Sequence, residues 1–281
     1  MDVGIGLPTT VPGCTGPVLT TWARRAESLG FASLGVLDRL VYDNYEPVVA
    51  LAAAAAVTER IRLAATILIA AYRDSPTVLA KQLATIDHLS GHRLVVGVAA
   101  GGREDDFLAA GSKYGGRGRR LDDIVAQLRE VWAGGDIGPR PVDGGPPLFM
   151  GGHSPAAMRR SALHGAGWIG GGSSTAGYAA LVGQARQVWR DKGRTDRPRM
   201  MSLGYVSLGP GGRERAEAYL RPYYAFAGPK AAMAAAGAIT DTGRLRETIA
   251  AYAEAGCDEL ILFPCTTDAD QVDLVAAEAL S

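Results

Sequence analysis

The chain has 281 residues, of which 47% are hydrophobic and 21% are charged, and its formal net charge is zero. This length suits one α/β barrel of about 250 residues, and the neutral charge gives no indication of nucleic-acid binding. The three cysteines, Cys14, Cys257 and Cys265, form no close pair, so neither a disulfide framework nor a metal site is expected. Unpaired cysteines favour a reduced, cytoplasmic protein.

No targeting or membrane segment is expected. The first ten residues, MDVGIGLPTT, lack the basic and apolar regions of a signal peptide. The most strongly apolar run, Val48–Val57, has ten residues, whereas a membrane span needs about 20. We interpret this run as a buried, alanine-rich helix.

Short apolar runs alternate with helical patterns along the chain. Most of these runs are continuously apolar, which indicates strands buried on both faces, as in a parallel sheet. We predict eight such strands, at Val3–Leu7, Ala32–Leu37, Arg62–Ile69, Arg93–Ala99, Pro147–Met150, Gly167–Gly170, Met201–Leu208 and Glu259–Phe263.

The segments between the strands carry helix patterns with clear ends. In Ser75–Gly91, Ser75 is the expected N-cap and Pro76 the first helical residue. Further helices are predicted where apolar residues recur three or four positions apart: a first helix with Trp22, Ala26 and Leu29 that ends at Gly30, one over Asp241–Gly256, and a last one over Asp268–Ala279.

Eight successive strand–helix units predict a (β/α)8 TIM barrel, with a doubly wound open sheet as the alternative. No linker divides the chain, so residues 1–281 are interpreted as a single domain. Two loops are longer than barrel turns require: Ala99–Arg120 after the fourth strand, and residues 223–240 after the seventh. Long loops of this kind commonly surround an active site.

Glycine dominates the chain directly after the fourth, fifth and sixth predicted strands. The motif GGHSP, residues 151–155, combines two glycines with Ser154 as an N-cap and Pro155 as the first helical residue. Backbone amides at such a helix start favour a phosphate group. We expect His153 to lie beside that phosphate and not to transfer protons.

The predicted strand ends lack the side chains of several common barrel reactions. All four lysines are assigned to helices or loops, which argues against a Schiff base, and the four histidines form no close pair for a metal ion. His88 and His164 fall in predicted helices. A glycine-rich mouth with few acid–base groups suits a cofactor that brings its own reactivity, such as a flavin.

Four segments follow one another in a specific order: RIRL at the third strand, SPTVLAKQLATIDHLSGHRL, GVAAGG followed by EDDF, and PPLFMGGHSPAAMRRSALHGAGWI. In this order they resemble the bacterial luciferase-like monooxygenase superfamily of flavin- or deazaflavin (F420)-dependent oxidoreductases. The resemblance covers most of residues 1–170 and is weaker over residues 175–281. It implies a barrel that binds FMN or coenzyme F420.

The resemblance also implies where the cofactor and the reacting groups lie. A bulge at Thr66–Ile67, which often contains a non-prolyl cis peptide in this family, would back the isoalloxazine ring. The turn at Asp38 and Arg39 would carry the catalytic groups. The phosphate seat would consist of Gly151, Gly152, His153 and Ser154, and the loop beside the ring of Ala100, Gly101 and Gly102.

The chain departs from the family pattern at three positions. Many members have Asp–His after the second strand, where the histidine can act as an acid or base, but here Arg39 follows Asp38. Arginine stays charged near neutral pH, so this position can bind an anion such as a carboxylate, a phosphate or a reduced ring. Gly102 stands where some F420 enzymes carry glutamate, and Ala166 where aspartate is usual.

The function expected from these residues is a monooxygenase that uses reduced FMN and O2 on a small organic substrate, with a separate flavin or F420 reductase as a partner. The alternative is hydride transfer with F420, for whose acidic tail Arg103, Arg117, Arg119 and Arg120 are available. A non-catalytic flavin-binding protein and a phosphate-handling isomerase or aldolase are further alternatives. By analogy with the family, the helix at residues 47–57 is considered as a homodimer contact.

Overall fold

The computed structural model describes residues 1–172 and 174–280, and over these residues eight parallel strands close into a barrel in chain order. The two ends of the chain meet in it, because β1 pairs with β8 with Val3 opposite Leu260. The predicted (β/α)8 barrel is confirmed, and the open sheet is wrong. The strands are β1 (Asp2–Gly6), β2 (Ser33–Val36), β3 (Arg62–Ile69), β4 (Leu94–Ala99), β5 (Leu148–Gly151), β6 (Gly167–Gly171), β7 (Arg199–Val206) and β8 (Glu259–Pro264).

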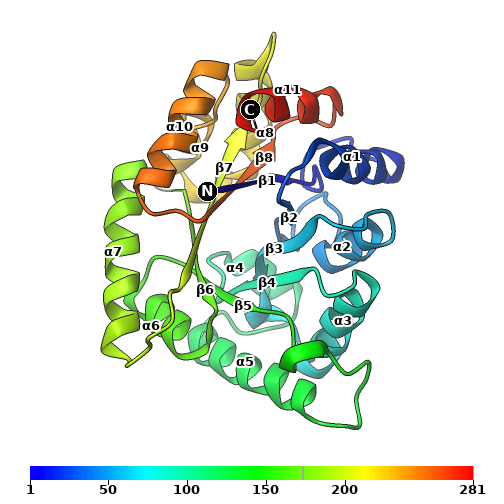
Figure 1. The fold of residues 1–281 in the computed structure, drawn as a ribbon, viewed down its shortest axis with the longest axis vertical. Coiled ribbons are helices and arrows are strands. Elements are labelled where there is room, and N and C mark those ends of the chain that lie inside the picture. The colour runs from blue at the N-terminus through cyan, green and yellow to red at the C-terminus, as the bar shows by residue number, and fades with distance from the viewer. Residues whose placement is uncertain (173, 281) are drawn as a thin grey trace.

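Helices surround the barrel in chain order, so that the last helix returns beside the first (Figure 1). The α-helices are α1 (Gly16–Leu29), α2 (Pro47–Ala55), α3 (Pro76–Leu89), α4 (Glu104–Ala109), α5 (Arg117–Ala133), α6 (Pro155–His164), α7 (Thr175–Asp191), α8 (Gly212–Tyr223), α9 (Lys230–Ala236), α10 (Thr242–Glu254) and α11 (Asp270–Ala279). Short 3-10 turns lie at η1 (Ala70–Tyr72), η2 (Val142–Gly144) and η3 (Ala225–Ala227).

The helix ends follow from local chemistry. The Ser75 hydroxyl accepts a hydrogen bond from the Val78 amide at 3.3 Å, as predicted for an N-cap. Gly30 ends α1 with φ 90°, a conformation that favours glycine. The last predicted helix begins two residues later than expected, at Asp270.

Each of the two segments expected as long loops contains a short helix. Within Ala99–Arg120, α4 forms at Glu104–Ala109, where three acidic residues in the first turn favour the helix N-terminus, and Arg117–Arg120 already belong to α5. In the second segment, α9 forms over the alanine-rich run Lys230–Ala236. The prediction of two long loops is therefore incomplete, because each segment contains a short helix that was not predicted.

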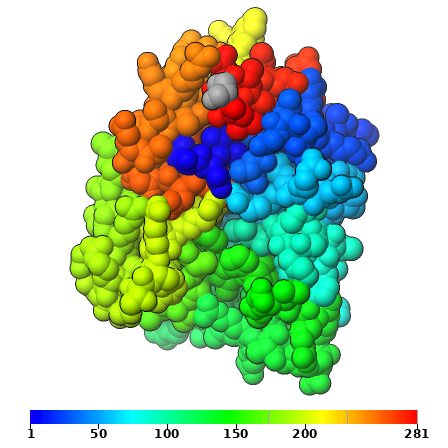
Figure 2. Space-filling view, viewed as in Figure 1, coloured from blue at the N-terminus to red at the C-terminus, as the bar shows by residue number. Residues whose placement is uncertain are grey.

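A cluster of charged residues closes the barrel at the amino-terminal ends of the strands. The side chain of Glu259 is 3% exposed, and its Oε2 accepts hydrogen bonds from Arg62 at 3.1 Å and from Arg199 at 2.8 Å. Both arginines also pair with Asp2 at 2.6 Å. The N-terminal residues lie at the centre of this face (Figure 2). Among the described residues, no helix is both long and apolar enough to span a membrane.

Candidate active site

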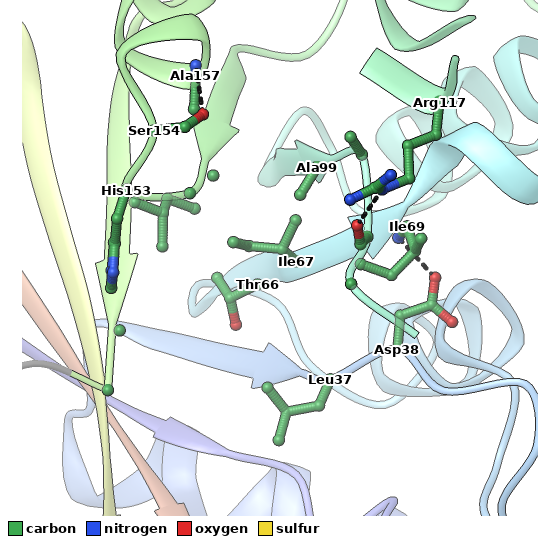
Figure 3. Close-up of a pocket in the computed structure, with 18 of the residues that line it drawn as sticks. Leu37, Asp38, Thr66, Ile67, Ile69, Ala99, Arg117, His153, Ser154 and Ala157 are labelled. Carbon is green, nitrogen blue, oxygen red and sulfur yellow. Dashed lines mark hydrogen bonds between the residues drawn. The ribbon is translucent and has the colours of Figure 1, made fainter. Parts of the chain in front are cut away.

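A cavity of about 940 Å³ opens at the carboxyl ends of the strands. Its wall comes from the β3 bulge, from the loops after β2, β4, β5 and β6, and from residues 223–226 at the end of α8 and just beyond it. Figure 3 shows the part of this wall around Ile67, with Asp38 and Arg117 on one side and His153 and Ser154 on the other. The structure brings ten of the eleven predicted site residues to this cavity: Asp38, Thr66, Ile67, Ala100, Gly101, Gly102, Gly151, Gly152, His153 and Ser154.

The middle of the cavity wall is the bulge in β3. The pairing of β3 with β4 shifts register between Ala65 and Leu68, and the Thr66–Ile67 peptide bond is cis, as the family resemblance predicted. Gly151 packs directly against this bulge, because a Cβ atom there would lie 2.1 Å from Cδ1 of Ile67. The bulge therefore presents Ile67 to the cavity at a position that only a glycine on β5 permits.

Two helix starts face the cavity at one end. The Ser154 hydroxyl accepts a hydrogen bond from the Ala157 amide at 3.2 Å and so caps α6, as predicted. The start of α5 contributes Gly116, Arg117 and Gly118 to the same wall. Exposed amides and the positive ends of two helices make this end of the cavity suitable for an anion.

Two arginines reinforce this end of the cavity. Arg117 donates through Nε to the Gly101 carbonyl at 2.9 Å (Figure 3). Arg160, on the second turn of α6, forms an ion pair with Asp122 and donates to the Gly118 carbonyl at 2.9 Å. Both side chains line the cavity, so this end has one arginine bonded to a backbone carbonyl and one paired with a carboxylate.

His153 lies at the same end, beside the two glycines of the motif. Burial lowers the pKa of its imidazole, although a hydrogen bond with the Gly171 backbone opposes this effect. A lowered pKa keeps the ring neutral at physiological pH. The charge at this end of the cavity thus comes from the arginines and the helix starts.

Asp38 is buried and held by three donors. Its Oδ2 accepts from the Ile69 amide at 2.8 Å and pairs with Arg73 at 3.1 Å, and its Oδ1 accepts from the Tyr72 hydroxyl at 2.6 Å. Burial raises the pKa of Asp38, while Arg73, Tyr72 and the Ile69 amide oppose the rise. These contacts fix the carboxylate against η1 at the edge of the cavity (Figure 3).

Arg39 does not line the main cavity. It borders a side pocket of about 200 Å³, and Asp38 and Gly102 line both this pocket and the main cavity. The residue is 8% exposed. Its guanidinium donates to the carbonyl groups of Tyr223 at 2.6 Å and Val41 at 3.1 Å. In this structure Arg39 is thus engaged with the protein backbone.

Several wall residues were not predicted individually. Tyr223, Tyr224 and Phe226 come from the segment expected to build the mouth, but no side chain there was singled out. Arg160 was missed as well; the signal available was its place two turns into α6, since helical side chains lean toward the helix N-terminus. Two of the four arginines considered for the acidic tail of F420 face a cavity: Arg117 lines the main cavity and Arg103 lines the side pocket. The other two do not, because Arg119 is exposed to solvent and Arg120 donates a hydrogen bond to the Ala71 carbonyl.

Curated relatives match parts of the chain. An uncharacterized protein of Mycobacterium tuberculosis is 41% identical over 87 residues, which cover 31% of this chain and 30% of that protein. An FMNH2-dependent dimethylsulfone monooxygenase of Pseudomonas fluorescens is 31% identical over 148 residues, which cover 47% of this chain and 40% of that enzyme. The chain thus spans less than half the length of these relatives.

Solved structures share the fold over the whole chain at low identity. An F420-dependent secondary alcohol dehydrogenase in complex with an F420–acetone adduct aligns with a TM-score of 0.84 and 18% identity, covering 99% of this chain and 98% of that one. The monooxygenase RslO1 from Streptomyces bottropensis aligns with a TM-score of 0.80 and 22% identity, covering 100% and 99%.

A family model described as luciferase-like monooxygenase matches residues 2–272. This range includes every strand of the barrel and every residue of the cavity wall. It also reaches across residues 175–272, where the motifs themselves gave a weaker resemblance. The chain therefore belongs to the luciferase-like monooxygenase family.

Proposed function

We propose that this protein is a monooxygenase that binds reduced FMN in the 940 Å³ cavity and oxygenates a small, largely apolar organic substrate. The observation that carries the cofactor assignment is the polarity of the cavity. Its wall combines two helix starts, Arg117 and Arg160 with the apolar Ile67 bulge and the aromatic residues Tyr223, Tyr224 and Phe226. This combination suits a ligand that carries both a phosphate and a flat aromatic ring.

The residues present fit FMN on observations of this structure. Gly102 and Gly172 line the cavity, and a Cβ atom added at either would meet no atom within 4 Å, so space beside the backbone is left open at both loops. The Ala156 amide at the α6 start and the guanidinium of Arg160 would hold the phosphate, since Pro155 has no N–H and the Ala157 amide donates to Ser154. Ile67 and Leu37 would contact the ring through apolar surface.

Bound reduced FMN would supply two electrons for the activation of O2, with one oxygen atom passing to the substrate and the other leaving as water. The chain's own residues position and shield this reaction. Tyr223, Tyr224 and Phe226 limit the access of water from one side of the cavity. Asp38, through its bond to the Ile69 amide, fixes the backbone beside the bulge.

The choice of oxygenation over hydride transfer is supported by sequence. FMNH2-dependent monooxygenases of two Pseudomonas species are 30–31% identical to the chain over 148–162 residues. The F420-dependent dehydrogenase and an F420-dependent tetrahydromethanopterin reductase share 17–18% with it over the whole chain, as does an FMN-binding Baeyer–Villiger monooxygenase at 17%, so these structures support the fold alone. Arg39 also cannot act as the acid or base that a histidine provides at this position in many relatives.

Titration with FMN and F420 in both redox states tests the cofactor assignment. We expect reduced FMN to bind more tightly than F420 in either state, and riboflavin, which lacks the phosphate, to bind at least about tenfold more weakly than FMN. Tighter binding of F420 would instead favour hydride transfer. Tight binding of reduced FMN without faster reoxidation in the presence of any candidate substrate would favour a flavin-binding protein.

Variants of the phosphate end make the same test specific. Arg160→Met should lower FMN affinity at least about tenfold, which is about 1.4 kcal/mol, and leave riboflavin affinity unchanged. Arg119→Met is the matched control, because Arg119 is an exposed arginine on the same helix as Arg117. Equal losses for FMN and riboflavin would contradict the phosphate seat.

An enzyme that consumes reduced FMN needs a source of it, so we propose a separate flavin reductase as partner.

We also propose a homodimer through α2. This helix is apolar along its whole length, yet Val49 is 64% exposed, and a helix that is apolar all round is normally buried. Val49→Glu should convert a dimer into a monomer in sedimentation-velocity experiments; a monomeric parent protein would contradict the dimer.

A further inference from the structure

Arg39 contacts the end of α8 and the residues just beyond it, residues 223–227. Its guanidinium donates to the Tyr223 carbonyl at 2.6 Å, and its central carbon lies 4.6 Å from the ring centre of Tyr42 and 4.8 Å from that of Tyr223. The ring of Phe226 is 5.7 Å away. Arginine over an aromatic face is attractive, and these rings hold the planar group in one orientation.

A second arginine reaches the same segment from the loop after β4. The guanidinium carbon of Arg103, just before α4, lies 4.2 Å from the ring centre of Phe226. Arg103 is itself fixed by an ion pair with Asp105 and by Asp106, whose Oδ2 lies 3.3 Å from its Nε. Phe226 therefore has a guanidinium group from each of two barrel loops.

Asp106 ties the two loops together. While its Oδ2 faces Arg103, its Oδ1 accepts hydrogen bonds from the amides of Leu40 at 3.2 Å and Val41 at 2.7 Å, directly after Arg39. Asp106 is buried, so these contacts are shielded from solvent. The loop after β2 and the loop after β4 thus act on residues 223–227 as one unit.

The held segment forms a wall of both cavities. Tyr223, Tyr224 and Phe226 line the main cavity and also the side pocket beside Arg39. Phe226 is half exposed, so its position depends on the two arginines more than on core packing. Within the segment, the amides of Ala227 and Gly228 donate to the carbonyls of Tyr224 and Ala225.

We propose that Arg39 and Arg103 form a clamp that fixes residues 223–227 as a wall of the substrate cavity. In this chain Arg39 stands where many family members have an acid–base histidine, and it acts as a positioning residue for this wall instead. Tyr224 and Phe226, held by the clamp, then determine the shape of the substrates that enter. This inference concerns the protein without cofactor and stands independently of the proposed oxygenation.

Hydrogen exchange measured by mass spectrometry on the cofactor-free protein tests the clamp. In Arg39→Met and in Arg103→Met, we expect the amides of Ala227 and Gly228 to exchange at least about tenfold faster, with β2 and β3 peptides unchanged. Phe226→Leu removes the ring that both guanidinium groups contact, so it should speed the exchange of the same two amides. Arg119→Met, at an exposed arginine outside the clamp, should leave exchange unaltered.

Rescue by a conservative variant separates positioning from general stability. Arg39→Lys keeps the charge but cannot donate to both Tyr223 and Val41 as the guanidinium does, so we expect an exchange rate between those of the parent and Arg39→Met. Unchanged exchange in residues 223–228 of both methionine variants would overturn the clamp. Faster exchange spread evenly over β2, β3 and this segment would overturn it too, since Arg39 would then support the whole barrel.

Discussion

The hydroxyl group of Tyr72 donates a 2.6 Å hydrogen bond to Oδ1 of Asp38, a carboxylate that the family resemblance placed in the catalytic turn. The other oxygen of Asp38 pairs with Arg73 at 3.1 Å. The side chains of Asp38 and Arg73 are 1% and 18% exposed. The principal contribution of Asp38 in this structure is to balance a buried cation and to fix η1 at the cavity edge.

Asp38→Ala should therefore destabilise the protein, because it removes the buried partner of Arg73 and leaves only the ion pair with Glu46 at 3.0 Å. Breaking an isolated buried ion pair costs on the order of 3–5 kcal/mol, and the remaining contact with Glu46 should keep the loss at the lower end of this range. Tyr72→Phe removes a single hydrogen bond to the same carboxylate and should cost about 1.5–3 kcal/mol. Chemical denaturation measures both. A stable Asp38→Ala protein that binds FMN but no longer oxygenates would instead make Asp38 a catalytic residue.

Gly151→Ala should alter the cavity floor. The new Cβ atom would lie 2.1 Å from Cδ1 of Ile67, so the Ile67 side chain must turn into the space proposed for the ring. Overpacking of this kind costs about 1–3 kcal/mol, and we expect weaker FMN binding in a titration.

Two further variants control the Gly151 experiment. Gly204→Ala, in β7, places its Cβ atom 3.9 Å from the nearest atom, in Leu262, so it should bind FMN like the parent protein. Ile67→Val removes the clashing atom and should restore binding when it is combined with Gly151→Ala. A double variant no better than Gly151→Ala would show that the loss does not arise at Ile67.

Glu27→Gln should reduce stability in a pH-dependent way. The Glu27 carboxylate accepts hydrogen bonds from the amides of Glu59, Arg60 and Ile61, which lead into β3. Burial raises the pKa of Glu27, but these three donors outweigh it and hold the pKa below its ordinary value of 4.5. The resulting stabilisation is present above pH 4.5 and is lost as the pH falls below that value.

Denaturation of Glu27→Gln across the pH range checks this sign. At pH 7 the variant should be less stable than the parent by about 1.5–3 kcal/mol, the contribution of a hydrogen bond to a charged group. The difference should shrink as the pH falls below 4.5. Glu130→Gln, at an exposed position on α5, should show no such difference. A constant gap between parent and Glu27→Gln at every pH would contradict an ionised Glu27.

The barrel could be predicted because buried parallel strands leave a local signature. Each strand is a short apolar run, and the predicted and observed bounds agree within about two residues, as for Met201–Leu208 against Arg199–Val206. The position of the α6 start at the cavity could be predicted for the same reason, whereas its binding of a phosphate stays a prediction. Ser154 caps a helix whose start follows directly in the chain, so Gly151 to Ser154 reach the cavity together.

The clamp could not be predicted, because its contacts join distant parts of the chain. Arg39 occupies the position of a family histidine, and its sequence neighbours gave no sign that its guanidinium bonds the Tyr223 carbonyl 184 residues away. The same holds for Arg103 and Phe226. Whether a charged side chain in a loop reaches the cavity or the backbone is decided by tertiary packing, which a local pattern does not contain.

His153 should report the phosphate directly. Burial lowers the pKa of its imidazole below the ordinary value of 6.5 in the cofactor-free protein, against a hydrogen bond with the Gly171 backbone that raises it. A phosphate bound at the α6 start is an opposite charge that favours the protonated imidazole, so FMN should raise this pKa. FMN binding would then be coupled to proton uptake at pH values between the lower pKa of the free protein and the higher pKa of the complex. An NMR titration of the imidazole signals, assigned with His153→Gln, measures both states. Riboflavin, which has no phosphate, should leave the pKa unchanged, and an equal rise with riboflavin and FMN would place the phosphate elsewhere.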